Sequence, residues 1–169
     1  HYENMSIALA ESVANQGQGF INSMAFGNGG TSVDPTGIIT YLTPNSTGTN
    51  ASLYNQTYSK VVDDRSVTNL DPQRNKIETR HVNGTNYTDV LVTCLLDYGE
   101  PNGQDAVDQA SQANSLYVFD ELGLVSYSPN GTGKLLTHVV FHPVQKSLNR
   151  LVQIDYTVRV QSLTGFNEG

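Results

Sequence analysis

The clearest alternation of apolar and polar residues lies near the end of the chain. The apolar residues Val152, Ile154, Tyr156, Val158 and Val160 alternate there with Gln153, Asp155, Thr157, Arg159 and Gln161. Successive side chains of a β-strand point to opposite faces. The segment therefore predicts a strand with an apolar face in a core and a polar face toward water or a neighbouring subunit.

Two turns that contain Asn-Gly predict β-hairpins earlier in the chain. They separate apolar segments 77–82 and 87–96, around Asn83-Gly84, and 122–127 and 135–141, around residues 129–133. Asn-Gly readily adopts the positive φ angles of a tight hairpin turn. The pattern also predicts strands over 36–42, 53–62 and 116–119. Pro143 is expected to end the strand before it.

The N-terminal segment has apolar residues at roughly helical spacing. They are Met5, Leu9, Val13, Phe20 and Met24. The spacing predicts a helix from Asn4 to about Met24, weakened at Gly17 and Gly19 and ended by residues 28–30. A short helix is expected over 105–113, inside one of the polar loops 27–35, 44–52, 63–75 and 97–114.

Together these patterns predict a mainly β protein, an antiparallel β-sandwich or barrel with long polar loops. We expect residues 1–30 to form an N-terminal helix or arm and residues 31–169 to form the β-sandwich domain. No internal repeat or linker divides the sequence further.

Charge and cysteine content exclude several classes of function. Charged residues make up 15% of the chain and the formal net charge is −7, so the surface repels nucleic-acid phosphates. No basic run or long apolar segment favours a membrane, and no signal peptide is expected. The single cysteine, Cys94, is expected to be a buried core residue. Without disulfides the chain fits assembly in a cytoplasm.

Residue pairs that resemble metal or phosphate sites have simpler interpretations. His138 and His142 would share a helix face, but on a predicted strand they lie about 13 Å apart, so we expect exposed or interface imidazoles. Asn130 to Lys134 (NGTGK) resembles a phosphate-binding loop, yet Leu135 follows where a Ser or Thr is required. A hairpin turn is the better interpretation.

Carboxylate pairs give no reason to propose catalysis. They are Asp63 with Asp64, Asp97 with Glu100, and Asp105 with Asp108. Adjacent strand residues diverge, and acidic residues in polar loops are commonly solvated, although weak calcium binding by residues 97–108 stays open. We therefore expect a protein that is not an enzyme, with no catalytic residues, cofactor or metal.

Glycan-related signals are present but diffuse. Asn-X-Ser/Thr triplets begin at Asn45, Asn50, Asn55, Asn83, Asn86 and Asn130. In a chain rich in Asn and Thr we interpret them as chance. The nine tyrosines are scattered over many predicted elements, which favours subunit contacts over a sugar-stacking face.

The C-terminal third carries a family resemblance. Residues 117–124 (YVFDELGL), 134–143 (KLLTHVVFHP) and 155–160 (DYTVRV) together resemble a module of tailed-bacteriophage virion proteins of the neck, collar and tail-associated type. The resemblance is limited to about residues 116–161. It implies a sandwich or barrel with extended arms and no cofactor, built into a ring at or near the head–tail junction.

Our hypothesis is therefore a virion structural protein, a head–tail connector, neck or collar component. Its partners would be copies of itself in a homo-oligomer and other virion proteins. Two alternatives are a capsid decoration protein and a carbohydrate-binding β-sandwich, for example of a tail fibre. An enzyme with an unrecognised site is the least favoured hypothesis.

Overall fold

The computed structural model describes residues 1–46, 48–101 and 116–163. The protein is mainly β, with antiparallel sheets and one N-terminal helix, as the sequence predicts. The elements are α1 (Tyr2–Val13), β1 (Ile21–Gly27), β2 (Thr31–Val33), β3 (Ile39–Tyr41), β4 (Gln56–Val61), β5 (Lys76–His81), β6 (Tyr87–Leu96), β7 (Leu116–Ser126), β8 (Val139–Ser147) and β9 (Val152–Gln161).

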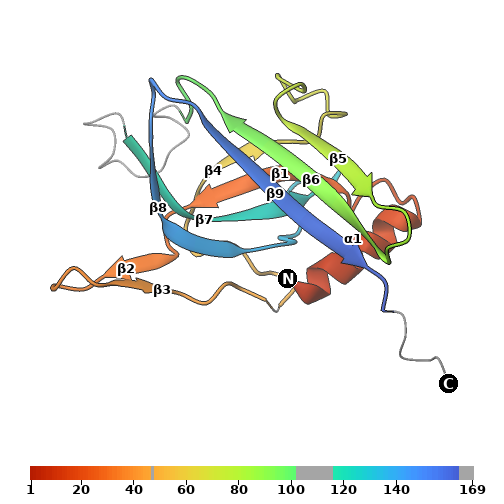
Figure 1. Cartoon of the computed structure of the whole chain (residues 1–169), viewed down its shortest axis with the longest axis horizontal. Helices are drawn as coiled ribbons and strands as arrows, with labels where there is room; N and C mark the ends of the chain where they lie inside the picture. Colours follow the sequence, from red (N-terminus) through yellow and green to blue (C-terminus); the bar gives the residue numbers. More distant parts are fainter. Residues whose placement is uncertain (47, 102–115, 164–169) are drawn as a thin grey trace.

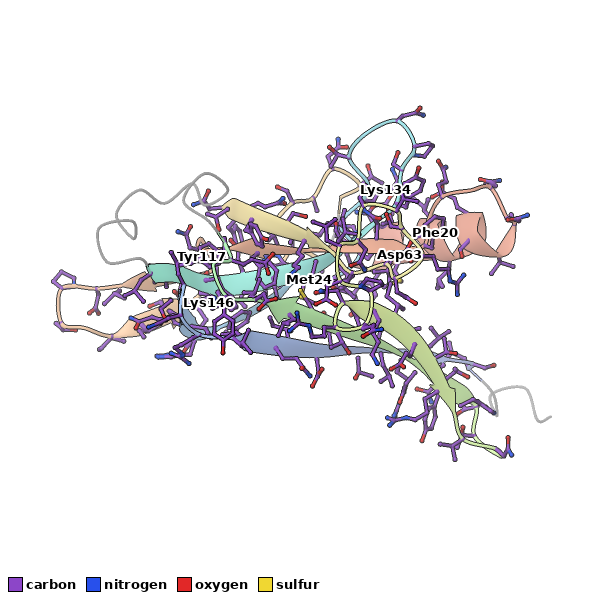
Figure 2. All side chains as sticks on the ribbon, turned by 90° about the horizontal axis from the view of Figure 1, so that it is seen from above. Phe20, Met24, Asp63, Tyr117, Lys134 and Lys146 are labelled. Atoms are coloured by element: carbon purple, nitrogen blue, oxygen red, sulfur yellow. The ribbon has the colours of Figure 1, made fainter. Side chains whose placement is uncertain are left out.

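The core lies between a four-stranded sheet, in the order β4-β1-β7-β8, and a three-stranded sheet, in the order β5-β6-β9. Met24 of β1 is fully buried between these two layers (Figures 1 and 2). It packs in one cluster with Phe26, Phe119 and Val92, which come from both sheets. This arrangement is a β-sandwich in which each sheet covers one face of the other.

The predicted alternation of β9 and the predicted hairpin around Asn83-Gly84 are confirmed. Val152, Ile154, Tyr156 and Val158 pack against the core, whereas Val160 is 41% exposed. β5 and β6 pair antiparallel around a turn in which Gly84 has a φ of +86°. A residue without a side chain fits that turn because positive φ costs glycine little.

The predicted helix through Met24 is wrong in its second half. α1 ends at Val13, and Gly17 and Gly19 both have positive φ. Ile21–Gly27, which the sequence placed in the N-terminal helix or arm, is instead β1, an inner strand of the sandwich that pairs with β4 and β7. Because its last five residues are all buried, it lacks the alternation that distinguishes a half-exposed strand from a helix.

Three further boundaries differ from the prediction. β7 is a single strand that runs through Asp120 and Glu121, where the sequence indicated a break. Pro143 lies inside β8, an edge strand with a register shift nearby, where a missing N–H is tolerated. The predicted strand 36–42 is reduced to β3. The predicted helix 105–113 lies outside the described residues.

Candidate functional site

A small hairpin separate from both sheets is the most prominent feature of the surface. β2 and β3 pair only with each other in the sheet order and project from the sandwich (Figure 1). We call residues 31–42 the arm. Its Val33, Ile38 and Tyr41 side chains are 62%, 63% and 51% exposed. A two-stranded hairpin alone is marginally stable in water, so this one depends on its attachment to the body.

The turn of the arm is fixed by one carboxylate. Asp34 Oδ1 accepts hydrogen bonds of 2.9 Å from the backbone N–H groups of Thr36 and Ile38. The hydrogen bond from the Thr36 hydroxyl, and these backbone bonds, lower the pKa of Asp34. The shape of the turn is therefore fixed by hydrogen bonds within the turn itself.

The base of the arm is attached to the middle of β7 through Asp120. Its Oδ1 accepts the Gly30 N–H at 2.8 Å and its Oδ2 accepts the Thr31 N–H at 3.0 Å. Asp120 is 3% exposed. Hydrogen bonds to a buried charged group are stronger than neutral ones, so this carboxylate sets where the arm leaves the body.

Glu121 holds the neighbouring loops in the same way. Its Oε2 accepts the N–H groups of Gly29 and Asn55, and its Oε1 accepts that of Tyr54, each at 2.9 Å. Burial by itself raises the pKa of Glu121, but hydrogen bonds from His138 and from these backbone groups outweigh it and lower the pKa. The two adjacent carboxylates thus hold the base of the arm and the irregular segment that leads into β4 on the same strand.

His138 completes this buried group, contrary to the exposed or interface position expected of it. Its Nε2 lies 2.8 Å from Glu121 Oε1, and its Nδ1 accepts the Asn45 N–H at 2.8 Å. Nε2 therefore carries the ring proton and donates a hydrogen bond to Glu121. His138 precedes β8 and crosses over β7, so strand alternation does not apply to it.

His142 is exposed on β8, where it contacts the Tyr41 hydroxyl at 3.4 Å. The two histidines face different partners. In the described part of the chain no three metal-ligating side chains gather into a group.

The remaining candidates for chemistry are held in structural roles. Cys94 is buried as expected, and burial raises its pKa to about 12, so its thiol is not a nucleophile at neutral pH. Asp63 and Asp64 diverge, because they accept N–H groups from Arg65 and Ile77 respectively.

The sequence indicated that Asp97 and Glu100 are solvated, but the structure gives both residues protein partners. Lys146, 1% exposed, donates to both of their backbone carbonyls, and Lys60 pairs with the Glu100 carboxylate. Asp105 and Asp108 lie outside the described residues. Lys134 follows a turn and not a helix start, in agreement with the hairpin interpretation.

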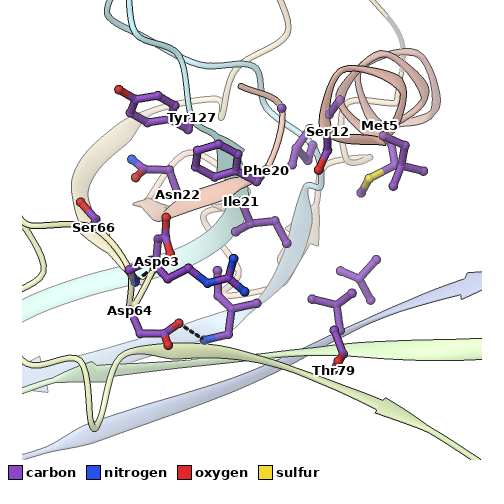
Figure 3. A pocket seen from close by; sticks show the side chains of 18 of the residues that line it. Met5, Ser12, Phe20, Ile21, Asn22, Asp63, Asp64, Ser66, Thr79 and Tyr127 are labelled. Carbon is purple, nitrogen blue, oxygen red and sulfur yellow. Dashed lines mark hydrogen bonds between the residues drawn. The ribbon is translucent and has the colours of Figure 1, made fainter. Parts of the chain in front are cut away.

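A cleft of about 810 Å³ opens between α1, the start of β1 and the inner face of the three-stranded sheet. Its floor is aliphatic and includes Met5, Leu9, Ile77, Val90, Val158 and Val160. Phe20 and Tyr127 stack at its rim, with ring centroids 5.1 Å apart, near Asn22 and Asp63 (Figure 3). These residues come from distant parts of the sequence, so no local pattern indicated the cleft.

The outer edge of β9 borders this cleft. Ser162 N–H bonds to Asn86 O at 2.8 Å, and the register with β6 is regular along the strand. Because hydrogen-bonding direction alternates along a strand, the even-numbered residues face β6. The odd-numbered residues point their N–H and C=O groups outward, where the described sheet ends.

Comparison of the chain with protein-family models, curated proteins and solved structures found no match. Among the described residues, no helix is both long and apolar enough to cross a membrane.

Proposed function

We propose that this protein is a structural component of a tailed-bacteriophage virion, located at the neck or collar, where copies of it form a ring. The observation that carries the proposal is the projecting arm. Its apolar side chains Val33, Ile38 and Tyr41 are more than half exposed, while its base is fixed by two buried carboxylates. Such an element is suited to contact with another molecule.

The residues that carry the phage resemblance support the same proposal. Asp120 and Glu121 belong to the segment YVFDELGL, and His138 belongs to KLLTHVVFHP. These three residues form the attachment of the arm. A motif that serves to position an arm is expected in a protein that acts by contact and not by catalysis.

Electron microscopy of purified virions labelled with a gold-conjugated antibody against this protein tests the proposal. We expect label at a single vertex, where the tail joins the head. Label over the whole shell would instead indicate a capsid decoration protein, and label at the fibres would indicate the tail-fibre alternative. Virions without label, and without its peptides in mass spectrometry, would refute a virion role.

The stacked Phe20–Tyr127 pair favours carbohydrate binding as a second candidate function. The two rings are 39% and 37% exposed, and they adjoin the polar side chains of Asn22 and Asp63 at the cleft. Aromatic faces beside hydrogen-bonding groups are typical of sugar sites. A glycan array compares the wild type with Tyr127→Ala; binding that disappears in the variant supports this function, and no binding by either removes it.

A further inference from the structure

We infer that the arm of one copy adds to the outer edge of β9 in a second copy, with apolar side chains of the arm entering the cleft beside that edge. The inference rests on the proposed self-assembly and names its contact. The arm then lengthens the three-stranded sheet of its neighbour by β-strand addition.

The arm has the chemistry of a strand donor. In the pairing of β2 with β3, Val33 lies opposite Ile39 and Thr31 opposite Tyr41, so these four side chains share one face. Ser32 and Thr40 share the other face, and the backbone bonds Asp34–Ile38 and Leu42–Gly30 continue the ladder, so Ile38 and Leu42 lie on that face too. The face with Val33, Ile39 and Tyr41 is mostly apolar, whereas the other face mixes apolar and polar residues, so we assign the first face to the neighbour's cleft.

Charge favours contact between two copies through this element. The chain has a formal net charge of −7, so copies repel each other at long range. Asp34 is the only charged residue between positions 31 and 42, and its carboxylate is occupied in the turn. The arm is thus an uncharged element that an acidic protein can present to another copy of itself.

β9 and the cleft have the matching chemistry of an acceptor. The N–H and C=O groups of Thr157 and Arg159 point outward from the edge, as the pairing with β6 requires. Val158 and Val160, on the inner face of the same strand, line the aliphatic cleft. A strand added at this edge gains backbone hydrogen bonds, and its inward side chains cover these valines.

The two elements meet between subunits and not within one. The arm projects from one end of the molecule, whereas β9 runs toward the opposite end (Figure 1). A contact between two different surfaces is heterologous, so its repetition closes a ring or extends a filament. The inference therefore supplies the kind of contact that a neck or collar ring requires.

Disulfide trapping between two single-cysteine variants tests the pairing. The native Cys94 is buried and does not compete. Thr40→Cys, on the face of the arm opposite Val33, Ile39 and Tyr41, is mixed with Thr157→Cys or Gln161→Cys on β9 and mildly oxidised. We expect mixed disulfide dimers with at least one β9 variant. Glu78→Cys, on the opposite edge strand β5 of the same sheet, is the matched control. Mixed with Thr40→Cys, it should give at least tenfold less mixed disulfide dimer.

A backbone substitution provides an independent measurement. Thr157→Pro removes an outward N–H that has no partner within the described sheet, so the fold should persist, as circular dichroism would verify. Self-association measured by mass photometry should weaken at least tenfold. Thr157→Val, which retains the N–H, should associate like the wild type.

Three outcomes overturn the inference: β9–β9 disulfides without arm–β9 disulfides, equal trapping at β5, or unchanged association of Thr157→Pro. If rings form while arm–β9 trapping fails, the inference is wrong and the proposed ring function stands. If the wild type remains monomeric at all concentrations and virions carry no label, the proposed function fails as well.

Discussion

At the scale of single residues, buried polar groups determine where the irregular segments run. Glu121 accepts four hydrogen bonds from two loops and His138. Lys146 donates to the carbonyls of Asp97, Glu100 and Ser147 at 2.7 to 3.0 Å. Burial lowers the pKa of Lys146, opposed by the nearby carboxylates. Each group is satisfied by backbone, so removing it leaves several buried partners without one.

Replacing Glu121 tests this role. In Glu121→Gln one carboxylate oxygen becomes an NH₂ group that faces N–H donors, so we expect a loss of about 3 kcal/mol in the free energy of unfolding at pH 7. Urea denaturation measures it. Glu78→Gln, whose exposed carboxylate lies 3.5 Å from Lys76, is the control and should change stability by less than about 0.5 kcal/mol.

The same variant has a pH signature. Folding lowers the pKa of Glu121 below its ordinary value of 4.5, so its contribution is complete above that pH and is lost as the pH falls through the lower, folded-state pKa. The stability difference between wild type and Glu121→Gln should therefore shrink in acid. A difference that stays constant from pH 7 to pH 3 would contradict this assignment.

At the scale of elements, β7 is the strand around which the others are organised. It pairs with β1 on one side and β8 on the other, and it carries both carboxylates that attach the arm. Gly123 lets residues 135–138 cross closely over it, because a Cβ there would lie 2.2 Å from Thr137 O and 2.7 Å from Leu135 Cδ1. The crossing places His138 against Glu121.

Gly123→Ala should therefore destabilise the protein by about 1–3 kcal/mol, measured by thermal or urea unfolding. The shorter contact is to a backbone oxygen, so trimming the neighbouring side chain should not help. The double variant with Leu135→Ala is the control. If it recovers the stability of Leu135→Ala alone, crowding by the side chain, and not by the backbone, is the cause.

At the scale of the whole molecule, the two sheets are held together by side chains on facing strands. Ile154 of β9 packs against the core, while Gln161 near the end of the same strand is exposed. The sandwich leaves β9 as an edge strand that runs across the molecule, and the arm projects from one end (Figure 1). The intact fold thus presents the two different surfaces on which the proposed contact between copies depends.

A charge on the inner face of β9 should disrupt the sandwich. Ile154→Asp places a carboxylate among apolar side chains, so we expect a loss of more than about 2 kcal/mol or failure to fold in soluble form. Gln161→Asp adds the same charge on the outer face and should stay within about 0.5 kcal/mol of the wild type. Equal unfolding midpoints for both variants would show that Ile154 is not part of the core.

The sequence by itself determined the elements in which a local pattern is complete. β9 alternates with period two, and Asn83-Gly84 supplies the turn between β5 and β6; both signals are contained in neighbouring residues. The sequence did not predict β1, because a strand that is buried on both faces has no alternation of apolar and polar residues.

Only the tertiary structure decided where the buried polar groups and the surfaces of the proposed contact lie. In the sequence, the charged residues Asp120 and Glu121 indicate a break in the strand. In the structure they lie within β7, because backbone N–H groups of residues 29–31 and 54–55 donate hydrogen bonds to their carboxylates. His138 can be buried because the Glu121 carboxylate accepts the hydrogen bond that its Nε2–H donates. The cleft likewise joins α1, β1 and three other strands, because burial depends on packing between segments that are far apart in the chain.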